Sequence, residues 1–398
     1  MPAKATKKLP VYVFIHGGGY NYGFSEIFHN PTMASIFIPN NIILVTFNYR
    51  LTHFGFFAWP DKHFPKNLGL WDQNAALRFV KENIEAFGGN PDDITIGGHS
   101  AGAASVHAHT ISPHSRHLFH KAIEMAGNLA SVWSIGDETY HFSEILAKEL
   151  GCDKCDGEKT KKCLQKLAVE DFWAAKQKLG FVATKPTMNN IYWKPVWDED
   201  FFDGKTMEEL TAESPPKPIL YGLDAGEAVV FTLNTGNPIA SFITDVGFIV
   251  PLVNEYRSKL KHGFESQFLY IFNFTREKDQ PILGMKPPHG SELLFLNGIN
   301  AYTHDQIKEF KADELRVQRT IGQSLVNFIK TGNPSIPGIQ VPELTTRSIS
   351  FFEIGKKSKV QENFYEPIVQ FWENASEKYE FDVITGKPYH SNHFRDEV

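Results

Sequence analysis

Residues 94–111 read ITIGGHSAGAASVHAHTI, and this stretch decides the fold class. Ile94–Ile96 is typical of a short buried strand, and the residues after Gly102 are typical of a helix. Between them, Ser100 has one glycine two positions before it and another two positions after it. A strained strand-to-helix turn that lifts a serine hydroxyl into solvent needs such small neighbours, because a side chain there would collide with the strand or the helix. The stretch therefore predicts an α/β fold with a nucleophilic Ser100; the alternative is that Ser100 is only a turn residue.

In the first half of the chain, apolar runs of strand length alternate with helical stretches. We expect strands at Val11–Ile15 and Ile42–Phe47, and a helix whose apolar face runs from Leu70 to Phe87. The later candidates are the strands Pro218–Tyr221, Gln267–Phe272 and Ser348–Phe352 and the helix Asp313–Lys330. This alternation predicts a mostly parallel central sheet flanked by helices.

Residues 136–215 differ from the rest of the chain. They are helical in character, rich in Lys and Glu, and contain all three cysteines. Such an insertion in a strand–helix architecture commonly forms a cap over the site, and a plain surface excursion is the alternative. Because no clear linker interrupts the chain, we expect a single domain over residues 1–398 with a helical cap at 136–215 and a polar tail at 379–398.

The composition is that of a soluble globular protein with a large core. Hydrophobic residues make up 42% of the 398 positions and charged residues 22%. The net charge of −6 argues against a generally basic nucleic-acid binder. No run approaches the roughly 20 apolar residues of a membrane span. The partner that we expect is a small-molecule substrate. The oligomeric state stays open.

A glycine triplet follows the first expected strand, in His16-Gly17-Gly18-Gly19. Acyl transfer builds negative charge on a carbonyl oxygen, and backbone N–H groups without side chains approach that oxygen closely. The triplet therefore favours an oxyanion hole, and a flexible glycine loop is the alternative.

A serine hydroxyl needs a general base, and the base needs an orienting acid. Glu227 follows an expected strand, and His289 lies in a Pro-Pro-His-Gly loop. Spacing alone does not select His289 from sixteen histidines, nor Glu227 over the nearby Asp224. The residues by themselves thus indicate a serine hydrolase and no more.

Longer segments carry a resemblance to a known family. They are LPVYVFIHGGGY at 9–20, VTFNYRLTHFGFF at 45–57, the block at 67–106 that contains the Ser100 motif, HGSELLF at 289–295 and NFIKTGNP at 327–334. The chain resembles the type-B carboxylesterase and cholinesterase family of α/β-hydrolases over about residues 9–373. The resemblance implies an α/β-hydrolase fold and carboxylesterase activity.

The resemblance also implies the roles of single residues. Ser100 matches the nucleophile, His289 the general base and Glu227 the acid. The backbone N–H groups that match the oxyanion hole are those of Gly18, Gly19 and Ala101. The implied reaction is two-step acyl transfer through an acyl-enzyme, with no metal and no organic cofactor.

Three departures from the family pattern affect these expectations. His99 stands where many relatives have glutamate, the interval between Glu227 and His289 is shorter than in relatives, and only fifteen residues precede His16. We therefore interpret the chain as truncated at its N-terminus. Two rivals to the esterase follow: a catalytically inactive, cholinesterase-like adhesion or scaffold protein, and a truncated chain without activity.

The resemblance implies a disulfide between Cys152 and Cys163, which leaves Cys155 unpaired. Zinc binding by the three cysteines is the alternative. A disulfide and the glycosylation sequons at Asn273 and Asn374 indicate the secretory pathway and a glycoprotein. The N-terminus MPAKATKKLP contains no signal peptide and indicates the cytoplasm instead.

Five histidines fall within fourteen positions, at His107, His109, His114, His117 and His120. A metal site is one interpretation of this spacing. The mixed helix and loop context favours a polar surface.

Overall fold

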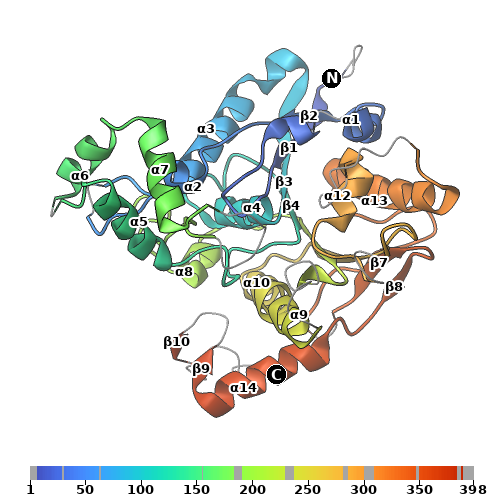
Figure 1. Cartoon of the computed structure of the whole chain (residues 1–398). Coiled ribbons are helices and arrows are strands. Elements are labelled where there is room, and N and C mark those ends of the chain that lie inside the picture. Colours follow the sequence, from blue (N-terminus) through green and yellow to red (C-terminus); the bar gives the residue numbers. More distant parts are fainter. Residues whose placement is uncertain are drawn as a thin grey trace.

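The computed structural model describes residues 7–28, 31–61, 64–154, 156–182, 191–228, 237–280, 286–299, 309–346, 349–382 and 387–388. Their central feature is a sheet of eight strands in the order β2-β1-β3-β4-β5-β6-β7-β8 (Figure 1). The strands are β1 (Leu9–Ile15), β2 (Ile43–Thr46), β3 (Gly89–His99), β4 (Lys121–Met125), β5 (Ile219–Asp224), β6 (Gln267–Asn273), β7 (Phe351–Gly355) and β8 (Lys359–Gln361). Neighbouring strands are parallel except for the antiparallel pair β7 and β8. The predicted mostly parallel sheet is confirmed.

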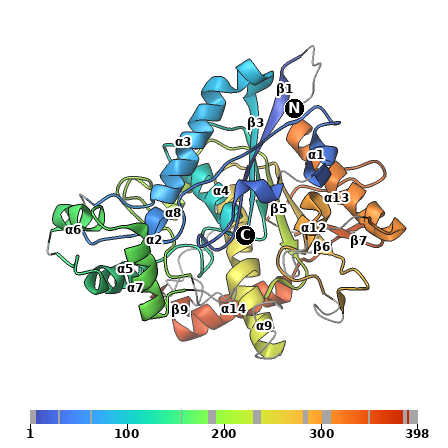
Figure 2. The same ribbon diagram turned by 45° about the horizontal axis from the view of Figure 1, so that its top comes forward.

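Helices cover both faces of this sheet, as the side-chain alternation of β1 illustrates. Val11, Val13 and Ile15 belong to one hydrophobic core, whereas Tyr12 and Phe14 belong to the other. The first core is completed by α3 (Leu68–Asn83), α4 (Ala101–Ile111) and α10 (Val250–Lys261), and the second by α1 (Pro31–Phe37), α12 (Ser291–Asn297) and α13 (Ala312–Thr331). Figure 2 shows α3 and α4 on one side of the sheet and α1, α12 and α13 on the other. The architecture is three-layered and agrees with the α/β-hydrolase fold.

The remaining described elements are shorter or peripheral. They are α2 (Thr52–Phe56), α9 (Asn237–Thr244), α14 (Glu366–Tyr379), the two-residue strands β9 (Phe381–Asp382) and β10 (Lys387–Pro388), the 3₁₀ turns Ser25–Phe28 and Ile84–Phe87, and a π turn at Asp245–Ile249. No helix among the described residues is both long and apolar enough to cross a bilayer.

Strand β4, like the edge strand β8, was not predicted from the sequence. Its five residues include Lys121 and Glu124, and both are buried in the centre of the sheet. Charged side chains are depleted in strands, so the segment lacks the usual signal. Glu124 is accommodated because the ammonium group of Lys259 on α10 lies 3.6 Å from its Oε1.

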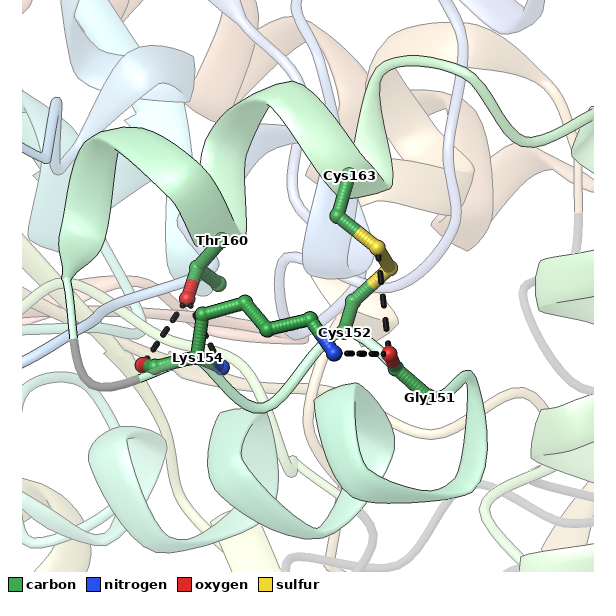
Figure 3. The surroundings of a disulfide bond; sticks show 5 residues. All are labelled: Gly151, Cys152, Lys154, Thr160 and Cys163. Carbon is green, nitrogen blue, oxygen red and sulfur yellow. Dashed lines mark hydrogen bonds between the residues drawn. A yellow bond between two sulfur atoms is a disulfide. The ribbon is translucent and has the colours of Figure 1, made fainter.

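The segment 136–215 contains the helices α5 (Glu138–Glu149), α6 (Gly157–Leu164), α7 (Val169–Leu179) and α8 (Met207–Ala212). Figure 1 shows α5, α6 and α7 grouped at one side of the sheet. A disulfide between Cys152 and Cys163 joins the end of α5 to α6 (Figure 3). The disulfide prediction is confirmed, and the alternative of a zinc site using these two cysteines is wrong. Cys155 lies outside the described residues.

Three of the predicted site segments follow the carboxyl ends of neighbouring parallel strands. Gly17–Gly19 follows β1, Ser100 follows β3 and Glu227 follows β5. These ends are level in the sheet, because Ile15 pairs with Gly98 on β3 and Gly222 on β5 pairs with the last residue of β4. The carboxyl edge of an open parallel sheet is where α/β proteins bind their ligands.

Candidate active site

Ser100 occupies a strained backbone position between β3 and α4. Its φ of 59° and ψ of −124° lie outside the regions that L-residues usually adopt. The turn is held by the Ser100 N–H, which donates to the carbonyl of Met125 at 2.8 Å. A Cβ atom at Gly102 would overlap the carbonyl oxygen of Ile15, and one at Gly98 would overlap the backbone of Gly102. The two glycines of the motif are therefore required by close backbone packing, as the sequence predicted.

The glycine loop after β1 lies directly against this turn. A Cβ built on Gly17 would come within 3.0 Å of the Ser100 Cβ, and the φ values of Gly18 and Gly19 are 112° and 59°. Within the described part of the chain, the N–H groups of Gly18 and Gly19 meet no hydrogen-bond acceptor. Ala101 begins α4, and the first N–H groups of a helix have no partner within the helix. The loop and the helix start thus bring backbone donors to the side of the sheet where Ser100 lies.

Glu227 and His289 form a part-buried hydrogen-bonded pair across 62 positions of sequence. Glu227 Oε2 lies 2.6 Å from His289 Nδ1, and the Glu227 carboxylate is fully buried. Its Oε1 accepts the N–H of Asp224 at 2.7 Å, and the His289 N–H donates to the Glu227 carbonyl at 3.1 Å. The carboxylate is therefore fixed at both oxygens, and the imidazole is oriented by it.

Asp224, which the sequence left as an alternative to Glu227, takes a different place. Its Oδ2 accepts the N–H of Gly290 at 2.7 Å and that of Ser291 at 3.3 Å. These bonds hold the backbone that follows His289, whereas the imidazole of His289 bonds to Glu227. The geometry distinguishes the two carboxylates by their partners.

The His289 ring packs against the rings of His99 and Phe248. His99, which precedes Ser100, has its ring centroid 4.6 Å from that of His289, and the Phe248 centroid is 5.2 Å from it on the π turn before α10. The contact with His99 brings His289 to the residue beside the candidate nucleophile. Phe248 could not be assigned a role from the sequence, because one Phe among 33 carries no local signal.

Three buried groups near His289 have shifted pKa values. Burial raises the pKa of the Asp224 and Glu292 carboxyls, and the charge of Glu292 raises that of Asp224 further. Burial also lowers the pKa of His99 well below its usual range, and the neighbouring His289 adds to this effect. The sequence did not predict a role for Glu292; its position three residues after His289, at the start of α12, is the signal that could have indicated one.

A cavity of about 340 Å³ lies between the 136–215 segment and the helical region around Val246, and Ser100, Glu227 and His289 are not among its lining residues. Its apolar lining is formed by Val132, Trp133, Phe142, Ile191, Phe242 and Val246. Ile191 is the nearest neighbour of a Cβ built on Gly19, at 3.3 Å, and Trp133 packs on Phe248 at 5.9 Å. Two residues of the cavity wall thus lie against the glycine loop and against Phe248, which packs on His289.

The five closely spaced histidines do not form one site. His107 and His109 are buried in α4, where His107 Nδ1 lies 3.0 Å from Glu255 Oε2 and His109 Nδ1 lies 2.8 Å from the Ser115 hydroxyl. His114 instead faces the carbonyl of Asp200. The expectation of a polar surface is wrong for His107 and His109, because α4 is enclosed by the sheet and its neighbouring helices.

A known protein family matches most of this chain. The model of the carboxylesterase family matches residues 1–240 and 232–372. The chain belongs to the carboxylesterase family. The two matched parts meet at 232–240, within the interval between Glu227 and His289.

Individual relatives include both enzymes and a protein that is not named as one. Gut esterase 1 of Caenorhabditis briggsae is 29% identical over 96% of this chain and 79% of the relative. The bile salt-activated lipase of Bos taurus is 37% identical over 93% of this chain and 72% of the relative. Human neuroligin-2 is 25% identical over 92% of this chain and 51% of the relative. Family membership and the esterase relatives support a hydrolase.

Proposed function

We propose that this protein is a serine carboxylic ester hydrolase that works through an acyl-enzyme. The observation that carries the proposal is the 2.6 Å contact between Glu227 Oε2 and His289 Nδ1, in a pair packed through His99 against the Ser100 turn. A carboxylate on Nδ1 leaves the other ring nitrogen available as a base. The family and the names of two relatives, an esterase and a lipase, support the same chemistry.

In the first half of the reaction, Ser100 attacks the ester carbonyl carbon while His289 removes the hydroxyl proton. The N–H groups of Gly18, Gly19 and Ala101 stabilise the oxyanion, and each such donor is worth roughly 10²–10³ in kcat. The tetrahedral intermediate then collapses, the C–O bond to the alcohol breaks, and His289 returns its proton to the leaving alcohol.

In the second half, a water molecule attacks the acyl-enzyme. His289 removes a proton from this water and returns it to Ser100 as the acid product leaves. Glu227 keeps the neutral ring in the tautomer with the proton on Nδ1 and stabilises the imidazolium in both halves. The buried position of Glu227 strengthens this interaction, because the local dielectric constant is low.

The substrate that fits this site carries an apolar acyl or alcohol group. The 340 Å³ cavity has mostly apolar walls, with the Glu138–Lys194 ion pair (3.3 Å) among its lining residues. Residues 138, 142, 191 and 194 all come from the segment 136–215, which we propose acts as the cap of a single domain. Apolar surface removed from water contributes about 25 cal/mol per Å² to binding of such a group.

The decisive experiment is covalent labelling with a fluorophosphonate probe. The wild-type protein should be labelled, Ser100→Ala should not, and Ser258→Ala should be labelled like the wild type. Ser258 is a suitable control because its hydroxyl bonds to Glu208 on the outer side of α10, away from the proposed site. A folded wild-type protein that is not labelled would exclude the esterase.

The match to neuroligin-2 favours one second candidate, a binding protein without catalytic activity. The same labelling experiment separates the two functions. Labelling at Ser100 supports the esterase, whereas a folded and unlabelled chain supports the binding protein. A chain that does not fold on its own would support the third possibility, an inactive product.

We also propose that the protein passes through the secretory pathway and is glycosylated. The Cys152–Cys163 disulfide supports an oxidising compartment, and both sequon asparagines, Asn273 and Asn374, are exposed. Expression in eukaryotic cells followed by glycosidase digestion tests this. A mobility shift that Asn273→Gln and Asn374→Gln together abolish supports the proposal, and an unmodified chain retained in the cytosol contradicts it.

A further inference from the structure

Four buried polar atoms converge next to the proposed active site, and apart from the contact between the Asp224 and Glu292 carboxyl groups they have no hydrogen-bond partner among the described residues. They are His99 Nε2, Asp224 Oδ1 and both carboxylate oxygens of Glu292. The exposed fractions of the three residues are 5%, 3% and 0%. Buried polar groups are almost always hydrogen-bonded, and an unsatisfied one costs about 1–3 kcal/mol or more when charged. A cluster of four such atoms calls for a ligand.

The arrangement of these atoms is that of a metal site. One ligand atom from each residue lies within 4.8 Å of the other two, and His99 Nε2 is 3.9 Å from Glu292 Oε1. Two ligands of one tetrahedral zinc ion are separated by roughly 3.3 Å, so small side-chain movements suffice to close the site. We propose that His99, Asp224 and Glu292 bind one divalent transition-metal ion.

Surrounding hydrogen bonds orient the ligands. The Gly290 and Ser291 N–H groups hold Asp224 Oδ2 and leave Oδ1 directed into the cluster. Carboxylates fixed in this way by outer contacts are typical of metal sites. One imidazole nitrogen with two carboxylates suits Zn²⁺ or Mn²⁺, whereas Ca²⁺ and Mg²⁺ prefer oxygen ligands alone.

A second buried cluster shows what a filled cationic position looks like in this fold. His107, Glu124 and Glu255 are also close enough to hold an ion. There the ammonium group of Lys259 bonds to Glu255 and lies 3.6 Å from Glu124. Among the described residues, no Lys or Arg side chain pairs with Asp224 or Glu292. The first cluster thus has the carboxylates of a cation site without a protein cation.

The test is direct measurement of Zn²⁺ binding to the metal-free full chain, by equilibrium dialysis at pH 7.5. The expected result is one bound Zn²⁺ per chain, with an affinity that falls on the order of 100-fold or more in His99→Gln and in Glu292→Gln. His262→Gln is the matched control, because His262 pairs with Glu208 on the surface at 2.8 Å and is the kind of group that binds zinc adventitiously. Zn²⁺ should also raise the melting temperature of the wild type but not of His99→Gln.

Two results would overturn the site. The first is a wild-type chain that binds no Zn²⁺ at 1 mM, which would mean that Asp224 and Glu292 share a proton instead. The second is zinc binding that His262→Gln removes while His99→Gln and Glu292→Gln retain it. Fluorophosphonate labelling of the same samples keeps the outcomes separate: an unlabelled chain that still binds zinc through His99 supports the site and contradicts only the esterase.

Discussion

Replacing Glu227 by glutamine tests the proposed acid through the orientation of a single amide. In the wild-type protein, Glu227 Oε1 accepts the Asp224 N–H at 2.7 Å and Oε2 faces His289 Nδ1 at 2.6 Å. A glutamine has only one oxygen, and the Asp224 N–H requires it at the Oε1 position. The NH₂ group then faces His289 Nδ1, which must act as an acceptor, so the neutral ring carries its proton on Nε2 and cannot take the proton of Ser100.

The size of the effect follows from the two ways in which the amide can lie. In the favoured orientation the ring has the wrong tautomer, a fault that costs about 10⁴ in kcat in enzymes of this type. Turning the amide over would place its NH₂ against the Asp224 N–H and leave a buried donor unpaired, at about 1–3 kcal/mol. That cost reduces the competent fraction roughly 5- to 150-fold, before the loss of carboxylate stabilisation of the imidazolium is added. We therefore expect kcat to fall by about 10³–10⁴.

The assay is steady-state hydrolysis of a p-nitrophenyl ester, with kcat and KM measured separately for Glu227→Gln and for Asp224→Asn. KM should change little, because neither substitution alters the apolar cavity. Asp224→Asn keeps an oxygen that can accept the Gly290 N–H, so a loss of about tenfold at most is expected there. Thermal unfolding of both variants serves as the folding control. If Glu227→Gln kept more than a tenth of the wild-type kcat, or if Asp224→Asn lost more than Glu227→Gln, the assignment of Glu227 as the acid would be wrong.

Four further predictions follow from the same structure. Gly18→Ala should lower kcat by about 10²–10³ with little change in KM, because a Cβ there overlaps the Tyr22 carbonyl and displaces an oxyanion donor; steady-state kinetics measures this. Phe142→Ala should raise KM for long-chain esters more than for acetate esters, since Phe142 lines the apolar cavity, and equal effects on both would contradict the cavity assignment. Burial raises the pKa of Asp198 to about 6, so its protonation stabilises the folded state as the pH falls through 6; the advantage of Asp198→Asn in unfolding free energy should therefore shrink by about 1.4 kcal/mol between pH 8 and pH 5 in denaturant titrations. Replacing Cys152 and Cys163 together by serine should lower the unfolding free energy by about 3 kcal/mol, and dithiothreitol should destabilise the wild type but not this variant.

Local sequence predicted the parts of this fold that depend on local backbone geometry. The strand–turn–helix around Ser100 was identified because Gly98 and Gly102 pack against backbone atoms, which leaves a glycine pattern in the sequence. The long helix from Ala312 to Thr331 has an apolar face and ends at Gly332, whose φ is positive. Strand β4 was not predicted because Lys259, the ion-pair partner of Glu124, lies on α10, and a local sequence pattern does not indicate such a distant pair.

In the proposed site, too, only the residues that depend on local backbone geometry could be predicted from the sequence. The sequence located Ser100 and the glycine loop, since each needs small residues next to backbone. It did not distinguish Glu227 from Asp224, which lie three residues apart and have different partners only in the folded chain. His289 was identified only by the resemblance, because its contact with Glu227 joins residues that are 62 positions apart, and sequence spacing does not predict such a contact.

His99 lies next to both the proposed catalytic residues and the proposed metal ligands. Its backbone belongs to the β3 turn that sets Ser100, and its side chain packs on His289 and lies 3.9 Å from Glu292. The residue at this position, which is glutamate in many relatives, determines whether the buried carboxylates of Asp224 and Glu292 face a third carboxylate or an imidazole nitrogen. A glutamate there would add a third carboxylate that needs a proton, whereas an imidazole nitrogen with two carboxylates can share a transition-metal ion. His99, where the chain departs from the family pattern, is thus the residue that makes a cation in this cluster chemically reasonable.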